Sequence, residues 1–586
     1  MAYHVDFRDV QFNVFDFLNI SQLLHYPAFS EQNLELYQMV LDESLKFAQK
    51  ELEPINASGD REGCKLVDGK VTTPRGYPKA FAAFAENGYV SMDANPALGG
   101  QGLPHTMRVA AYEFLTGANI PLSMYGGLTH GAAHLIESFG SDSLVQLFCE
   151  KMYRGQWAGT MCLTEPGAGS AVGDLKSTAT PLPDGTYSIS GQKIFISGGD
   201  QDLTENIVHL LLARIPGDPA GTKGISLFVV PKYWVSKDGQ MGALNDVICT
   251  NLEHKMGIKA SSTCALSFGE SGQCRGILLG ERAQGMRYMF QMMNEARLLC
   301  GVQGSSVAAA SYEHAWRYAS ERVQAGVNIL NYPDVRRNLA LCRSLSEGMR
   351  ALVYYAAFYL DLAEKEKDPV KKARYQNRID FLTPICKAYC SDHGFKVTEL
   401  AMQIYGGYGY VSDYPIEQYM RDVKISSIYE GTNGIQALDL LGRKISANQG
   451  LFYRELCEDI VNTLMPLAAQ SQLQKEVQEL KKAIERIGQV LQSFAEQMMS
   501  GQKEAPFYHA TPFLEMMGHT VIAFLLLHQA MHCESLAKIN TENPTFYQNK
   551  IHTARFFAAQ FLPRVHAFAK TMQDQDRSAF SIIYQA

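Results

Sequence analysis

One carboxylate, Glu430, stands between an aromatic residue and a glycine in residues 427–433 (Ser-Ile-Tyr-Glu-Gly-Thr-Asn). Ile428 and Tyr429 can shield the carboxylate from water, which favours a role as general base. Gly431 lets the backbone come close to a ligand. An acidic residue beside a glycine is also common in solvated turns. The stretch by itself therefore leaves a catalytic and a purely structural interpretation open.

Three further stretches precede it in the chain: 162–170 (Cys-Leu-Thr-Glu-Pro-Gly-Ala-Gly-Ser), 193–199 (Lys-Ile-Phe-Ile-Ser-Gly-Gly) and 403–410 (Gln-Ile-Tyr-Gly-Gly-Tyr-Gly-Tyr). Together with Tyr-Glu-Gly-Thr at 429–432, this set resembles the signature motifs of the acyl-CoA dehydrogenase family of flavoproteins. The resemblance covers roughly residues 35–445. The long C-terminal extension is similar to that of the longer bacterial fatty-acyl-CoA dehydrogenases.

The resemblance implies FAD-dependent removal of two hydrogens from an acyl-CoA thioester, giving a trans-2-enoyl-CoA in fatty-acid β-oxidation. Glu430 is then the base that takes the α proton, and the β hydrogen leaves as hydride to the flavin. The backbone N–H of Glu430 and a flavin hydroxyl would bind the thioester carbonyl. Tyr429 is assigned to the substrate side. Some family members carry the base on an earlier helix, at the position of Ala296. Glu295 is offset by one residue, which favours Glu430.

The resemblance also implies contacts to FAD. Phe195 stands where the family has an aromatic side chain packed against the flavin, and Ser197 where it has a hydroxyl donor. Arg322 matches an arginine that binds the pyrophosphate of a neighbouring subunit's FAD. The full set of expected FAD contacts is Met161, Cys162, Leu163, Thr164, Phe195, Ile196, Ser197, Arg322, Gln403, Gly406, Gly407 and Thr432. Without the motif, Phe195 would be expected to point into the sheet.

Ser170, Asn294 and Arg297 match family positions that contact the CoA moiety. Two departures from the family pattern affect FAD contacts. Gly434 stands where a Gln is common, and residues 323–326 (Val-Gln-Ala-Gly) replace a Thr-Phe-Gly run. No metal site is expected, because the twelve cysteines form no CxxC and no His/Cys cluster has zinc spacing.

Helices and strands must position these residues, and the hydrophobic periodicity that predicts them changes twice along the chain. Helical patterns fill 35–157, β patterns with Gly/Pro turns fill 158–282, and long helical patterns return over 283–446 and 447–586. We therefore predict an α+β protein. Its parts are an N-terminal arm (1–34), an N-terminal α domain, a middle antiparallel β barrel or sandwich, a C-terminal four-helix bundle and an additional helical domain. Within these parts we predict that Pro54 ends a first helix, that a further helix covers 131–139, and that one helix covers 461–499.

Composition limits the function classes. The chain has 586 residues, 46% of them hydrophobic and 19% charged, with a formal net charge of −7. Residues 451–586 hold 12 Lys and Arg against 13 Asp and Glu, so no basic surface for nucleic acid is indicated. The N-terminus resembles neither a secretory signal nor a transit peptide. We expect a cytoplasmic protein without stable membrane insertion.

Competing functions remain open at this level. The favoured function is a dehydrogenase that passes electrons to an electron-transfer flavoprotein and acts on medium-to-long straight acyl chains as a homodimer. An acyl-CoA oxidase would share the fold and base but use oxygen. A non-catalytic, DNA-associated flavoprotein is the alternative of another class, and it is disfavoured by the charge balance and by Glu430.

Overall fold

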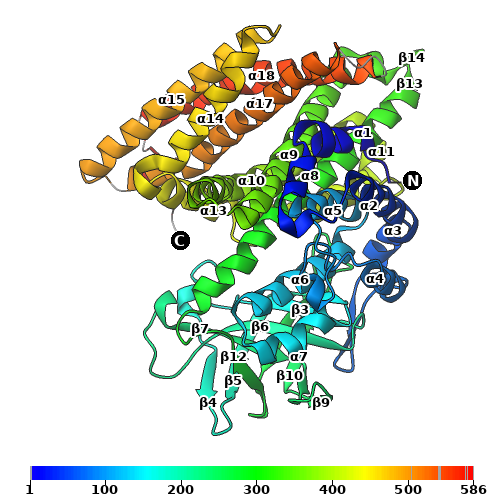
Figure 1. Cartoon of the computed structure of the whole chain (residues 1–586). Helices are drawn as coiled ribbons and strands as arrows, with labels where there is room; N and C mark the ends of the chain where they lie inside the picture. Colours follow the sequence, from blue (N-terminus) through cyan, green and yellow to red (C-terminus); the bar gives the residue numbers. More distant parts are fainter. Residues whose placement is uncertain (1–2, 503, 539–542, 575, 577, 585–586) are drawn as a thin grey trace. The chain divides into compact units, whose positions relative to one another are not determined.

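The computed structural model describes residues 3–502, 504–538, 543–574, 576 and 578–584. Two residues of the predicted arm and several of the predicted C-terminal domain lie outside this set. The chain folds into two compact units. Unit 1 comprises residues 1–4, 24–299 and 412–425, and unit 2 comprises 5–23, 300–411 and 426–586. The order of helical, β and helical regions along the chain confirms the expected fold class (Figure 1).

Unit 1 begins with helices. They are α2 (Leu34–Phe47), α3 (Glu53–Glu62), α4 (Tyr77–Glu86), α5 (His105–Ala118), α6 (Ile120–Phe139) and α7 (Asp142–Tyr153). The prediction that Pro54 ends the first helix was wrong. The chain passes from α2 through a π-helical turn (Ala48–Leu52) into α3, where Pro54 occupies the first turn and needs no N–H partner. Helix α6 also starts earlier than expected, because the Asn119 side chain caps it by accepting from the Leu122 N–H at 3.0 Å.

A short hairpin, β1 (Lys65–Val67) and β2 (Lys70–Thr72), interrupts these helices. The β region of unit 1 contains ten further strands. They are β3 (Trp157–Cys162), β4 (Thr178–Pro181), β5 (Tyr187–Ser197), β6 (Asn206–Arg214), β7 (Ile225–Pro231), β8 (Tyr233–Val235), β9 (Met241–Leu244), β10 (Val247–Leu252), β11 (Thr263–Phe268) and β12 (Arg275–Leu278). The main sheet has the order β10-β11-β5-β12-β7-β6-β3, with β4 beside β5 and β6.

The sheet is not purely antiparallel, because β3 runs parallel to β6. A parallel neighbour needs a long crossover, and residues 163–205 supply it. Strand β6 is buried on both faces. Val208, Leu210 and Leu212 face a core shared with α6 and α7, while Leu211 and Ala213 face a second core formed with β5, β10 and β11.

The chain returns to unit 1 through α12 (Ile416–Val423), directly before the Glu430 segment. Arg421 of this helix forms an ion pair with Asp60 at 2.7 Å. Asp422 accepts a hydrogen bond from the Ile258 backbone N–H. These bonds hold α12, the helix that precedes residues 427–433 in the chain, within unit 1.

Helix α8 (Gly285–Glu321) begins in unit 1 and ends in unit 2. The other helices of unit 2 are α1 (Phe7–Gln11), α9 (Pro333–Lys365), α10 (Pro369–Tyr405), α11 (Gly407–Tyr410), α13 (Asn433–Asp439), α14 (Leu451–Ala468), α15 (Gln474–Met499), α16 (Glu504–Tyr508), α17 (Ala510–Leu536), α18 (Pro544–Gln573) and α19 (Ser578–Ser581). The single helix predicted over 461–499 was wrong, since a turn at 469–473 separates α14 from α15. The Ser471 hydroxyl accepts from the Leu473 N–H and starts the new helix.

Helices α14, α15, α17 and α18 lie side by side (Figure 1). Within the described residues, α17 is the one helix long and apolar enough to cross a membrane, and 83% of its apolar window is buried inside the protein. It packs against α9, α10, α13, α14, α15 and α18. Its apolarity is therefore explained by its central place in unit 2.

The N-terminal segment is held in unit 2 by buried charges. Asp9 of α1 has no exposed side-chain surface and pairs with Arg350 at 2.6 Å and with Lys550 at 2.8 Å. Lys550 also pairs with Glu347 at 2.8 Å. Burial opposes ionisation of Asp9, but the two cations hold its pKa below the ordinary value. The segment thus joins α1, α9 and α18 through one network.

We expect Asp9→Ala to lower the free energy of unfolding by about 3–5 kcal/mol, because it removes the carboxylate that pairs with both buried cations, Arg350 and Lys550. Urea unfolding followed by circular dichroism measures the change.

The matched control is Asp16→Ala. Asp16 pairs with Arg8 at 2.9 Å, but both side chains are about one-third exposed. Loss of this pair should cost less than about 1 kcal/mol. Equal effects of the two substitutions would contradict a special role for the buried network.

Candidate active site

Glu430 occupies a strained turn in unit 2, between α12 of unit 1 and α13 of unit 2. Its φ is +58°, a left-handed conformation that side chains other than glycine rarely adopt, and Gly431 follows at +81°. The side-chain amide of Gln436 donates to the carbonyls of Glu430 (3.1 Å) and Gly431 (3.2 Å). The residue is half-buried, and its carboxylate atom Oε2 is shielded from solvent. The structure thus presents a carboxylate at a fixed position and largely out of water.

The segment after Glu430 is anchored on α10. The buried Asn433 side chain donates to the Ala388 carbonyl at 3.2 Å and to the Ser391 hydroxyl at 2.9 Å. Its amide oxygen accepts from the Lys387 ammonium at 2.8 Å. Neither Asn433 nor Gln436 was expected to have a role in the site. Only their positions just after the Tyr-Glu-Gly-Thr motif could have indicated one.

Tyr429 is fixed on the other side of Glu430. Its hydroxyl donates to the amide oxygen of Gln303 on α8. Burial, together with the nearby Cys300 thiol and Glu430 carboxylate, raises the pKa of Tyr429 well above its ordinary value. Tyr429 is therefore a neutral hydrogen-bond donor at physiological pH.

In unit 1, the predicted flavin-lining segments lie together on β3 and β5. The Ile194 N–H donates to the Thr164 carbonyl at 2.9 Å. The fully buried Lys193 ammonium donates to the Leu163 carbonyl (3.1 Å) and to the Glu165 carboxylate (2.8 Å). Lys193 thus ties the end of β3 to β5.

Glu165 organises the loop that follows β3. Its carboxylate accepts from the N–H of Lys176 (2.6 Å) and from the N–H and hydroxyl of Ser177 (3.1 and 2.6 Å). Burial opposes its ionisation, but Lys193 and these donors hold its pKa below the ordinary value. Glu165 and Lys193 belong to motifs recognised in the sequence, yet their pairing was not predicted.

Phe195 does not point into the sheet. It lies at a bulge, because Lys193 pairs with Leu266 whereas Ile196 pairs with Cys264, which leaves one extra residue on β5. Phe195 has φ +58° and is 59% exposed, while the next residue, Ile196, is buried in the core. An exposed aromatic side chain beside the Met161–Thr164 segment is the arrangement that a flat ring ligand requires. Ser197 follows at the end of the strand, half-buried.

Arg322 and the 403–410 stretch come together in unit 2. Arg322 follows α8, and its guanidinium carbon lies 5.4 Å from the centre of the Tyr408 ring. Residues 323–328 form a tight hairpin with Ala325 and Gly326 at positive φ. With the Gln324 side-chain amide oriented so that its oxygen faces Arg322, this oxygen accepts from the Arg322 guanidinium at 2.7 and 3.1 Å. The Val-Gln-Ala-Gly departure from the family pattern is therefore a two-residue turn that steadies the arginine.

The glycines after α10 leave open space. Gly406 has φ +62° and ψ −140°, a conformation restricted to glycine, and a Cβ on Gly406 or Gly407 would meet no atom within 4 Å. Gln403 lies one turn before them and is exposed. Thr432 is also exposed. Its oxygen caps α13 by accepting from the Ile435 N–H, which leaves its hydroxyl proton for another acceptor.

The expected CoA contacts all belong to unit 1. Arg297 is buried rather than on the surface, and it donates to the Asn294 side chain at 3.3 Å. Asn294 and Ser170 are exposed. The structure thus places in unit 1 both the expected CoA contacts and the expected flavin-lining residues Met161–Thr164 and Phe195–Ser197. Tyr429, Glu430, Thr432, Arg322 and the 403–407 turn belong to unit 2.

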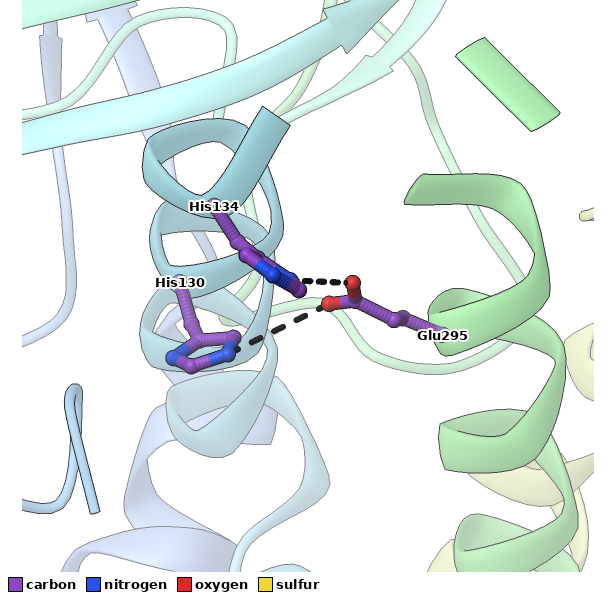
Figure 2. Close-up of side chains that lie close together, drawn as sticks. All are labelled: His130, His134 and Glu295. Carbon is purple, nitrogen blue, oxygen red and sulfur yellow. Dashed lines mark hydrogen bonds and ion pairs between the residues drawn. The ribbon is translucent and has the colours of Figure 1, made fainter. Parts of the chain in front are cut away.

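Sequence reasoning missed one polar cluster in unit 1, shown in Figure 2. His134 on α6 lies 2.6 Å from Glu295 on α8, and His130 lies 4.0 Å from the same carboxylate. Burial and Arg108 lower the pKa of His130 to about 4. Burial opposes protonation of His134 as well, but Glu295 raises the pKa of His134 to about 9. Glu295 therefore interacts with two histidines. From the sequence it was considered only as a residue offset by one position from an alternative base.

Four family models match consecutive parts of the chain. They are the N-terminal domain of acyl-CoA dehydrogenase (35–156), its middle domain (160–271), its C-terminal domain (283–445) and an acetyl-CoA dehydrogenase C-terminal-like domain (455–582). The boundaries follow the changes from helical to β and back to helical structure.

Relatives that match over nearly the whole chain support the same family. A 3-methylmercaptopropionyl-CoA dehydrogenase of Ruegeria pomeroyi is 37% identical over 96% of both chains. A butyryl-CoA dehydrogenase of Syntrophomonas wolfei is 36% identical over all of this chain and 99% of the relative. Among solved structures, an acyl-CoA dehydrogenase of Bacillus anthracis complexed with FAD shares the fold, with a TM-score of 0.77, 21% identity, and coverage of 93% of this chain and 89% of that one. The chain belongs to the acyl-CoA dehydrogenase family of FAD-dependent oxidoreductases, which act on CH–CH bonds of their donors.

Proposed function

We propose that this enzyme dehydrogenates an unbranched acyl-CoA between its α and β carbons and that Glu430 is the base. The observation that carries the proposal is the Glu430 carboxylate, whose Oε2 is shielded from solvent on a left-handed turn that partly buried hydrogen bonds hold in place. A surface turn would need neither the strain nor the anchoring.

The reaction removes the α proton and the β hydrogen and leaves a double bond between the two carbons. Glu430 takes the α proton onto its carboxylate and becomes a carboxylic acid. Shielding of the carboxylate from water strengthens it as a base, and its fixed position replaces a search through many side-chain orientations. Bound FAD supplies the acceptor for the β hydride. Tyr429 is neutral, and its hydroxyl is hydrogen-bonded to Gln303. Its side chain would cover one side of the base and keep water away.

The residues of this chain fit FAD. An exposed aromatic ring on a bulge, Phe195, lies beside the Met161–Thr164 segment on the neighbouring part of unit 1. In unit 2, Arg322 offers a fixed guanidinium suited to a pyrophosphate, beside glycines with open space around them. Thr432 and Gln403 offer exposed hydrogen-bonding groups. The unit 1 residues would contact the flavin ring, and the unit 2 residues would contact the dinucleotide part of FAD.

The similarity to the Ruegeria and Syntrophomonas enzymes favours short chains over the medium-to-long chains expected from the family at large. Their named substrates, 3-methylmercaptopropionyl-CoA and butyryl-CoA, both carry unbranched acyl groups with four or five heavy atoms in the chain. We therefore propose a short, unbranched acyl thioester as the substrate class.

The remaining parts of the proposal rest on the family resemblance. Electrons pass to an electron-transfer flavoprotein, the reaction serves β-oxidation, and the protein acts as a cytoplasmic homodimer. An oxidase would bind the same substrate but reduce oxygen. A DNA-associated flavoprotein would need a basic surface, which the charge balance of residues 451–586 does not supply.

The proposed substrate class is tested by anaerobic bleaching of the flavin with butyryl-CoA, 3-methylmercaptopropionyl-CoA and palmitoyl-CoA. We expect kcat/KM for the two short substrates to exceed that for palmitoyl-CoA at least about tenfold, the scale of discrimination that a pocket reaches through chain length. The reverse order would overturn the proposed class. Rapid reoxidation of the reduced enzyme by air, with peroxide formed, would show an oxidase instead.

Glu430→Gln should keep FAD and acyl-CoA binding while turnover falls by about three orders of magnitude, because the amide has nearly the same shape but cannot accept the α proton. Flavin absorbance per protein and ligand-induced spectral shifts report binding, and steady-state assays report turnover. Glu399→Gln, an exposed glutamate on α10, is the control and should keep full turnover. Near-normal turnover of the Glu430→Gln enzyme would show that Glu430 is not the base.

Lys193→Met should weaken FAD retention at least about tenfold, because the buried Glu165 carboxylate loses its cation and the loop after β3 loosens. The test is the apparent dissociation constant of FAD, measured from the change in fluorescence when FAD is added to the apoenzyme. Lys223→Met, at an exposed lysine of the same β region, is the control. The same dissociation constant in both variants would show that the ion pair does not support the flavin site.

A further inference from the structure

The His130, His134 and Glu295 cluster lies outside every role assigned above. The two histidines are four residues apart on α6, so they share one face of the helix, and that face meets Glu295 on α8 (Figure 2). One ligand-type atom from each of the three residues lies within 4.8 Å of the others. Imidazole nitrogens at this helical spacing, joined by a carboxylate from a second helix, are a common set of metal ligands.

The hydrogen bonding of His130 prepares one ring nitrogen as a ligand. Its Nδ1 lies 3.0 Å from the Val90 carbonyl, which accepts only from a protonated nitrogen. In the neutral ring, Nε2 then carries a lone pair. That atom lies 3.4 Å from Asp93 Oδ1 and 4.0 Å from Glu295 Oε2. Three electron-pair donors therefore converge on the same small region.

Asp93 provides an independent indication. Its side chain is only 1% exposed, and its Oδ2 is held by His105 at 2.6 Å and by Arg108 at 3.2 Å. Within the part of the chain that the structure describes, its Oδ1 accepts no hydrogen bond. A buried carboxylate oxygen left without a donor costs free energy, and a cation would remove that cost. This oxygen is the one that faces His130.

We propose that His130, His134, Glu295 and Asp93 bind a divalent transition-metal ion of the Zn²⁺ class. Two imidazoles and two carboxylates satisfy a tetrahedral ion at bond lengths of about 2.0–2.2 Å. The contacts from Val90, His105 and Arg108 to these ligands act as the outer hydrogen bonds that orient metal ligands in other proteins. The ion would link α6, α8 and the Asp93 segment.

The site has a route for entry. His134 is 29% exposed and Glu295 is 18% exposed at the side chain, whereas His130 and Asp93 form the buried end. A metal ion arriving from solvent would insert between His134 and Glu295, which now share a direct contact of 2.6 Å. No metal site was expected from the sequence, because no CxxC and no His/Cys cluster with zinc spacing occurs in it.

The test uses the full-length holoenzyme, stripped with a chelator and then equilibrated with Zn²⁺. We expect about one zinc per chain by mass spectrometry of the metal content, a rise in Tm of the FAD-loaded protein, and an anomalous scattering peak at the zinc edge among the four side chains. These readouts do not depend on catalysis. Failure here therefore differs from failure of the proposed dehydrogenase function.

His134→Ala and Glu295→Gln change the partly exposed ligands, so they avoid the folding risk of replacing buried His130. Each should weaken zinc binding at least about 10–100-fold, because loss of an outer-shell partner alone has that effect at metal sites. His552→Ala, at an exposed histidine of α18, is the matched control and should bind zinc like the natural protein. Zinc-free natural protein, or unchanged zinc affinity in both ligand variants, would overturn the proposal. An anomalous peak at the cysteines alone would do the same.

Discussion

The left-handed backbone at Glu430 is the constraint on which the chemistry depends. A non-glycine residue with positive φ costs about 1–3 kcal/mol, so the surrounding structure must hold it. Gln436 binds the two carbonyls of the turn, and Asn433 locks the following helix onto α10. The Asn433 bond is buried and the two Gln436 bonds are partly buried, so water has little access to them. Glu430, the proposed base, therefore depends for its position on α10 and α13 rather than on its own side-chain preferences.

Much of the fold could be predicted from local patterns, whereas several details depend on distant partners. Helical periodicity and motif order predicted the helical, β and helical regions. The β1–β2 hairpin was missed although Asp68-Gly69, a favoured hairpin turn, lies at its tip. The outward position of Phe195 could not be read from β5 alone, because the bulge arises from the register with β11. The same holds for Arg297, whose burial depends on its surroundings and not on its helix.

Buried charges were the least predictable feature for the same reason. Asp9 meets partners 341 and 541 residues away, and Glu165 meets Lys193 across 28 residues. No local spacing indicates such pairs, yet each one fixes a segment: the N-terminal arm in one unit and the loop after β3 in the other. Complete pairing is what makes these charges tolerable, since an isolated buried ion would be far more costly.

Close packing of α6 against α8 explains why the histidine cluster exists where no ligand motif was recognised. A Cβ on Gly127 would approach Leu299 to 3.2 Å, and one on Gly131 would approach Met292 to the same distance. Small residues on α6 thus let the two helices come near enough for Glu295 to reach across. A larger residue at either position would have to displace the Leu299 or Met292 side chain of α8. The glycines of α6 and the polar residues beside them therefore act together. This can be recognised only when α6 and α8 are considered together.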